Sequence, residues 1–214
     1  MFVSLGGWCD IAWQIENLEG TQRWGPCNWI MTPLQNLPLI FSERFSKIVD
    51  ERYLRLFEYY RDGQRRTTIL NSYYGVFLTH EFSRDSSEFI IENWQDEIAG
   101  VSQKWQSRVG EWFDMISAAE DVIFVRKQGK VSIPQYPNSM ATHEGDYLQI
   151  RDAMRLISPA AQLALVNPGC NIVSPDIRTA NIRAGGAEDW DTPADYWKGP
   201  TREWQSFLNS IQST

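Results

Sequence analysis

The sequence predicts one α/β domain over residues 1–214, with a mostly parallel central sheet and helices on both of its faces. Segments with strand and helix patterns alternate along the chain, and several strand segments are apolar on both faces, as in parallel sheets. No repeat, low-complexity tract or linker divides the chain. With 214 residues and a hydrophobic fraction of 43%, the chain can bury the core that such a domain needs.

The first half of the chain predicts three strands and three helical regions. A short apolar run ending in two glycines indicates the first strand, and apolar residues three and four positions apart indicate the helix after it. Proline in a helix interior removes a hydrogen bond and clashes with the preceding turn, so Pro38 divides one helical region. The expected elements are a strand at 2–5, a helix at 8–18, two helical pieces within 32–48, a helix at 51–61, and strands at 65–70 and 75–82.

The second half continues the alternation of helices and strands. Tryptophan and aliphatic residues at helical spacing predict a long helix whose apolar face packs in the core. The expected elements are this helix at 94–116, a strand at 122–125, a loop at 128–146, a helix at 146–156, a strand at 162–166, an irregular stretch at 170–200 and a helix at 201–211.

Composition argues against several functional classes. The net charge of −7, without any Lys/Arg-rich run, argues against a nucleic-acid partner. No apolar stretch approaches 18 residues and the start does not resemble a secretory signal, so we expect a soluble, cytoplasmic protein without a membrane partner. Three irregularly spaced cysteines do not form a disulfide framework, and two histidines without a C-x-x-C pair argue against a metal site. No cofactor is expected, because the stretch LGGWCD lacks the features of a nucleotide-binding loop.

Reactive or polar residues follow three of the predicted strands. The first strand leads through Gly6 and Gly7 to Cys9, the strand at 75–82 contains His80 near its end, and the strand at 122–125 leads to Arg126. In an open α/β sheet, functional sites form outside the carboxyl ends of the strands. If these strands are parallel in one sheet, the three groups converge on one edge.

Cys9 has physical reasons to be reactive. It opens a predicted helix, whose unpaired N–H groups and partial positive charge favour a thiolate. The N–H groups of Gly6 and Gly7 are candidates to hold an oxyanion, and His80 is the candidate base. Two plainer interpretations stay open: Cys9 as a small buried helix residue, and His80 as a core histidine, which would leave His143 as the base.

Five short motifs occur in order: VSLGGWC with the helix after it, WGPCNW, the strand ending in LTHEF, VIFVR, and a closing YWKG followed by EW. Together they resemble a bacterial family that is described as papain-like cysteine peptidases and was long classed as a domain of unknown function. They are similar to the family's S-L-G-x-x-C, P-F-D-W, His, F-V-R and W-G…E-W patterns. The resemblance covers nearly the whole chain.

The resemblance implies a role for individual residues. Cys9 would be the nucleophile and His80 the base, while Arg126, from the F-V-R strand, would hold a substrate carboxylate or phosphate. Asn28 stands where the family has Asp, and an amide can also orient a histidine, as in Cys-His-Asn sites. Glu81 is the alternative support for His80, although adjacent residues of a strand point to opposite faces. Trp29, in the same motif, would contact the substrate.

These residues together predict thiol-dependent acyl chemistry at an amide, ester or thioester of a small-molecule or peptide substrate. Hydrolysis and acyl transfer use the same groups, so both stay open, as does the oligomeric state. The alternatives are a non-catalytic binding module on a hydrolase-like scaffold, and an esterase similar to the SGNH hydrolases that uses Ser4 or another hydroxyl. A papain-like α+β architecture is the alternative fold.

Overall fold

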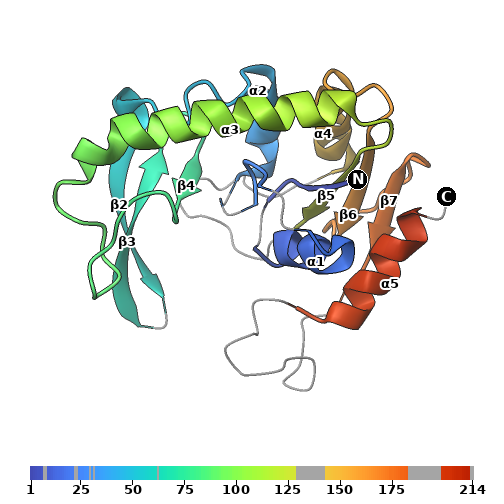
Figure 1. The fold of residues 1–214 in the computed structure, drawn as a ribbon. Coiled ribbons are helices and arrows are strands. Elements are labelled where there is room, and N and C mark those ends of the chain that lie inside the picture. The colour runs from blue at the N-terminus through green and yellow to red at the C-terminus, as the bar shows by residue number, and fades with distance from the viewer. Residues whose placement is uncertain are drawn as a thin grey trace.

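The chain forms two separate β-sheets with helices packed around them (Figure 1). The parallel sheet has the order β1 (Phe2–Ser4), β5 (Ile123–Lys127), β6 (Gln162–Val166), β7 (Ile177–Ala180). The antiparallel sheet has the order β2 (Leu54–Arg61), β3 (Gln64–Asn71), β4 (Val76–Leu78). The computed structural model describes residues 1–6, 9–21, 24–28, 30, 32–61, 63–128, 143–182 and 199–212, without the side chains of residues 9 and 61.

Helices cover both faces of the parallel sheet, as the sequence predicts. The α-helices are α1 (Cys9–Glu19), α2 (Leu37–Ser42), α3 (Ile98–Ala118), α4 (Glu144–Arg155) and α5 (Thr201–Gln212); short 3₁₀ helices span Leu34–Asn36, Glu51–Tyr53 and Trp94–Glu97. Alternate residues of β5 face opposite sides: Ile123 and Val125 pack with α1 and α5, whereas Phe124 packs with α2, α3 and α4. The α/β prediction is therefore confirmed, with the small antiparallel sheet as an addition.

Helix α3 joins the two sheets. It runs along the top of Figure 1 and passes over both of them. Its tryptophans Trp105 and Trp112 are buried in the larger core cluster, as the helical spacing predicts. None of the helices in the described ranges is long and apolar enough to cross a membrane.

The predicted helix at 51–61 is wrong, because this segment is mainly the strand β2. All eight residues of β2 pair one to one with β3, and the Phe57 ring meets Phe77 of β4 edge-on at 5.0 Å between centroids. Pairing to a neighbouring strand outweighs local helix preference in such a Tyr- and Phe-rich segment. The strand β7 was also missed, because its residues Arg178 and Thr179 are exposed and its pattern is not apolar.

The predicted division of the 32–48 region near Pro38 is confirmed, but the helix is shorter than expected. A 3₁₀ turn precedes α2, which ends at Ser42. Arg44 and Phe45 then adopt positive φ angles of 49° and 58°, which reverse the chain. Phe45 and Ile48 are nevertheless buried, so the apolar pattern predicted the core positions correctly without predicting where the helix stops.

Candidate active site

Helix α1 begins at Cys9, five residues beyond the end of β1. In Figure 1, β1 runs from the labelled N-terminus toward the antiparallel sheet. The helix that carries Cys9 therefore starts at the end of the parallel sheet that faces β2, β3 and β4. Gly7, Trp29 and the Cys9 side chain lie outside the described residues, so their predicted roles stay predictions.

Gly6 lies where two backbone segments meet. It has a φ of +71°, and a Cβ at this position would lie 2.7 Å from the Cys27 carbonyl oxygen and 3.1 Å from that of Ile30. Only glycine fits such a conformation and such a contact without strain. The Gly6 N–H donates to Ser4 Oγ at 3.1 Å, so it could join an oxyanion site only by giving up this bond.

The buried side chain of Arg126 connects the segment that contains Leu5 with the segment that contains Thr32. Its side chain is only 3% exposed, Nη1 donates to the Leu5 carbonyl oxygen and Nη2 to that of Thr32, both at 2.7 Å. Burial lowers the pKa of Arg126 to about 10, so the guanidinium stays charged at neutral pH. These contacts favour a structural clamp between the segment before Cys9 and the segment after residue 31; the predicted contact with substrate stays a prediction.

Asn28 lies in a tight turn beside α1 and α3. Its N–H donates to the Gly25 carbonyl oxygen at 3.0 Å, and its side chain is buried. The side-chain oxygen lies over Gly25, where an added Cβ would be 2.7 Å away. Asn28 also lines a small cavity together with Ser4, Glu16 and Trp112. The Asn28 amide therefore lies near β1 and α1 of the parallel sheet.

His80 lies in the turn after β4, with an exposed side chain. Its pKa is lowered, first by partial desolvation and then by Arg84, while Glu81 and Glu88 oppose the shift. The imidazole is therefore neutral at neutral pH and can accept a proton. Because β4 belongs to the antiparallel sheet, the predicted convergence on one sheet edge is wrong for His80, although it holds for the neighbours β1 and β5.

Two further candidates are Glu81, as the residue that supports His80, and His143, as the base. Glu81 forms an ion pair with Lys104 of α3, with 2.5 Å between Nζ and Oε2. His143, immediately before α4, has a side chain that is 67% exposed, and its Nε2 lies 3.8 Å from Asp146 Oδ1. These contacts leave His80 as the better candidate base and give Glu81 a partner of its own.

A partly buried ion pair lies next to the candidate nucleophile, and no sequence motif indicates it. Asp10, in the first turn of α1, pairs with Lys127 at the end of β5, and the Lys127 ammonium also lies 5.8 Å from the Trp204 ring centroid. Burial raises the pKa of Asp10, and Lys127 opposes that shift. In the sequence, Asp10 is only an acid in a first helical turn and Lys127 only a lysine at a strand end. Many solvent-exposed residues occupy such positions, so the sequence does not indicate that these two pair.

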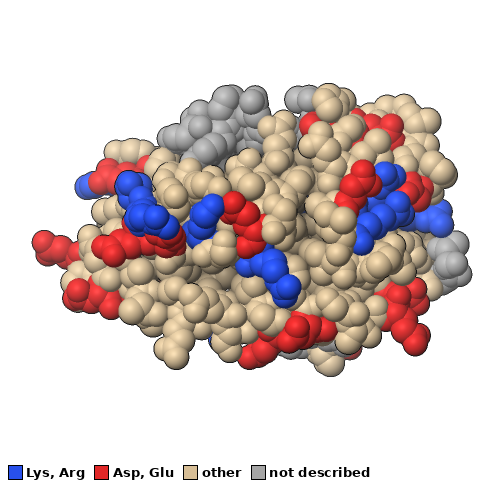
Figure 2. Space-filling view, turned by 90° about the horizontal axis from the view of Figure 1, so that it is seen from above, with Lys and Arg blue, Asp and Glu red and all other residues tan. Residues whose placement is uncertain are grey.

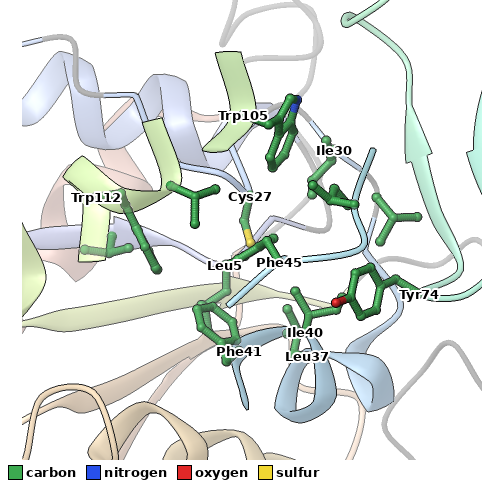
Figure 3. Packing of buried hydrophobic residues seen from close by; sticks show 14 of the residues in the cluster. Leu5, Cys27, Ile30, Leu37, Ile40, Phe41, Phe45, Tyr74, Trp105 and Trp112 are labelled. Carbon is green, nitrogen blue, oxygen red and sulfur yellow. The ribbon is translucent and has the colours of Figure 1, made fainter. Parts of the chain in front are cut away.

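Cys27 is a core residue and not a second reactive thiol. Figure 3 shows its side chain among Leu5, Phe45 and Trp112, and it is fully buried. Burial raises the pKa of Cys27 from 9.0 to about 12, against a smaller effect of Arg126. Cys27, which stands where the P-F-D-W pattern has Phe, therefore occupies a buried apolar position in this chain.

We expect Cys27 to resist iodoacetamide in the folded protein and to react only when denaturant unfolds it. The folded state keeps the thiol protonated above pH 9.0, where the unfolded chain loses that proton, so this group lowers stability as the pH rises toward about 12. Mass spectrometry of labelled peptides with and without urea measures this. Labelling of Cys27 at the same rate in both conditions would contradict its burial.

Comparison with known proteins identifies the family. The model of the family described as "Putative papain-like cysteine peptidase (DUF1796)" matches residues 1–135. This range contains Cys9, Asn28, His80 and Arg126, and it covers more than half of the chain, so the chain belongs to this family. Neither the curated proteins nor the solved structures contain a match.

Proposed function

We propose that this protein is an enzyme of thiol-dependent acyl chemistry, with Cys9 as nucleophile and His80 as base. The observation that carries the proposal is the position of Cys9 as the first residue of a helix after a parallel strand, in the family described as "Putative papain-like cysteine peptidase". A helix start favours the thiolate form of a cysteine. The thiolate attacks an amide, ester or thioester carbonyl and forms a thioester acyl-enzyme, while the C–N, C–O or C–S bond breaks and the leaving amine, alcohol or thiol takes the proton held by His80. The acyl group then passes to water or to an amine, and Cys9 is released.

The surrounding residues have distinct roles in this proposal. The backbone N–H groups of Gly7 and Cys9 stabilise the oxyanion, and that of Gly6 contributes once Ser4 releases it. Asn28 supports the imidazole, in the manner of Cys-His-Asn sites. With its lowered pKa the His80 imidazole is neutral at neutral pH and so has a free nitrogen for the thiol proton, and a charged Asn28-held imidazolium forms only on that transfer.

Replacing His80 with glutamine tests the pair directly. We expect His80→Gln to slow the alkylation of Cys9 by iodoacetamide at pH 7 by roughly tenfold or more, because the thiol loses its proton acceptor. His143→Gln is the matched control, since its exposed imidazole lies before α4; we expect its alkylation rate to stay within about twofold of the wild-type rate. The rate at Cys9 is measured by mass spectrometry of the labelled peptide.

The opposite pattern would assign the base differently. A large effect of His143→Gln together with no effect of His80→Gln would contradict the proposed pair. Cys170, which is half-buried, serves as an internal standard in every sample, because neither histidine is among the groups that shift its pKa.

A further inference from the structure

The ion pair of Asp10 and Lys127 lies where α1 begins. Asp10 directly follows Cys9 in the chain and has a side chain that is only 3% exposed, while that of Lys127 is 21% exposed. Lys127 ends β5, and β5 pairs in parallel with β1, the strand that leads to α1. The pair is therefore part of the sheet edge at which the candidate nucleophile lies.

Further contacts hold this ion pair in place. The Lys127 ammonium lies 5.8 Å from the ring centroid of Trp204 in α5, the helix beside α1 in Figure 1. Gly199, shortly before α5, comes so close that an added Cβ would lie 3.4 Å from Asp10 Oδ2 and 3.3 Å from Trp204 Nε1. Three distant segments thus enclose the two charges, which interact more strongly than an exposed pair does.

Asp10 by itself makes the start of α1 less suitable for a thiolate. Like charges that lie close together disfavour each other's ionised forms, and Asp10 is the immediate neighbour of Cys9. The backbone N–H groups of Asp10 and Ile11 favour the charged form of the Asp10 carboxylate. The positive end of the helix therefore already stabilises one anion, and a second anion at Cys9 needs a further positive charge.

Lys127 supplies a positive charge at this place. The helix α1 packs against β1, β5 and α5. The strand β1 has no charged residue, and Arg126 faces the other side of the sheet, where it binds backbone carbonyl oxygens. Arg202 and Glu203 of α5 are not among the groups that shift the pKa of Asp10. Within the described ranges, Lys127 is the charged side chain that lowers it, against the larger effect of burial.

We propose that Lys127 is a positioning residue of the site: its ammonium neutralises Asp10 and holds the start of α1, so that a thiolate can form at Cys9. The proposal rests on the proposed function, in which Cys9 is the nucleophile. Lys127 acts through Asp10 and does not contact the substrate in this role. A helix start favours a thiolate in this chain because the carboxylate beside Cys9 has its own counter-ion.

Removing the two charges separately and together tests this role. The variants are Lys127→Met, Asp10→Asn and the double variant Asp10→Asn/Lys127→Met, and the readout is the pH midpoint of Cys9 alkylation by iodoacetamide. A carboxylate without its counter-ion disfavours the thiolate, so we expect Lys127→Met to raise the midpoint by about one pH unit. An ammonium without its counter-ion favours the thiolate, so Asp10→Asn should lower it. The double variant should lie within about 0.3 pH unit of the wild type.

The opposite signs of the two shifts separate this role from a merely structural one. If the pair only docks α1 on the sheet, both single substitutions loosen the same contact, and the midpoint moves in one direction or stays unchanged. Either of these results overturns the proposal. Lys127→Arg keeps the charge and should restore the wild-type midpoint. If circular dichroism shows that Lys127→Met is unfolded, Asp10→Asn alone decides: a lower midpoint agrees with the proposal, and an unchanged or higher one overturns it.

The same data distinguish this proposal from the proposed function. A wild-type midpoint near the value of about 8.5 for an ordinary thiol contradicts a nucleophilic Cys9. Opposite shifts around that value would still show that Lys127 compensates the charge of Asp10. Cys170 serves as the internal standard, because neither Asp10 nor Lys127 is among the groups that shift its pKa. Mass spectrometry of the labelled peptides gives both midpoints from one sample.

Discussion

Gly6→Ala is expected to lower the free energy of unfolding by about 3 kcal/mol, because it adds two costs at one position. The φ of +71° is unfavourable for an L-residue by about 1–2 kcal/mol. The new methyl group would also lie 2.7 Å from the Cys27 carbonyl oxygen, which is backbone and cannot rotate away. Overpacking of this kind typically costs about 1–3 kcal/mol more. Urea unfolding at neutral pH measures the loss.

Gly20→Ala is the matched control for this prediction. Gly20 has a similar φ of +65°, but nothing lies within 4 Å of an added Cβ. It therefore isolates the conformational cost, which we expect to be about 1 kcal/mol. Equal losses in the two variants would show that Gly6 does not approach the Cys27 and Ile30 carbonyl oxygens as described.

Arg126→Met is expected to destabilise the protein by about 2–4 kcal/mol. The substitution keeps an unbranched side chain but leaves the buried Leu5 and Thr32 carbonyl oxygens without the donors that lie 2.7 Å away. A buried polar group that loses its partner costs about 1–3 kcal/mol. Part of that loss is offset, because the variant no longer buries a charge. Urea unfolding measures the change, with faster Cys27 labelling as a second readout.

The result separates the two roles considered for Arg126. If it serves as the clamp, Arg126→Met loses stability and exposes Cys27, and Arg126→Lys recovers part of both because an ammonium can reach one of the carbonyl oxygens. If the guanidinium serves only to bind a substrate, Arg126→Met should retain or even gain stability, since a buried charge without a counter-ion is costly. The latter outcome would contradict the clamp.

Much of the fold could be predicted from apolar periodicity. The strands near residues 2, 123 and 162 and the long helix α3 each present a continuous or helically spaced apolar pattern, and each has the predicted type. The segment of β2 could not be assigned in this way. Its sequence LRLFEYYR is compatible with a helix, and only its pairing with β3 makes it a strand.

The candidate site could be predicted in part. The position of Cys9 at the start of a helix follows from the glycines before it and the spacing after it, and the structure agrees. The roles of contacts between distant segments could not be predicted. Arg126 binds carbonyl oxygens 94 and 121 residues away along the chain, and Asp10 pairs with Lys127, so neither interaction leaves a local pattern.

The surface also limits the choice of partners. On the face seen in Figure 2, basic side chains lie next to acidic ones, and no large area of positive charge appears. Together with a net charge of −7, this gives little attraction to a phosphate backbone.

The alkylation rate of each cysteine as a function of pH tests the central claim most directly. The protein holds its own controls, since Cys27 is fully buried and Cys170 is half-buried. Measured by mass spectrometry with iodoacetamide between about pH 5 and 10, Cys9 should react fastest, with a midpoint well below the value of about 8.5 for an ordinary thiol. A Cys9 that reacts no faster than Cys170 and only near that value would contradict a nucleophilic Cys9 and favour a binding module on a hydrolase-like scaffold.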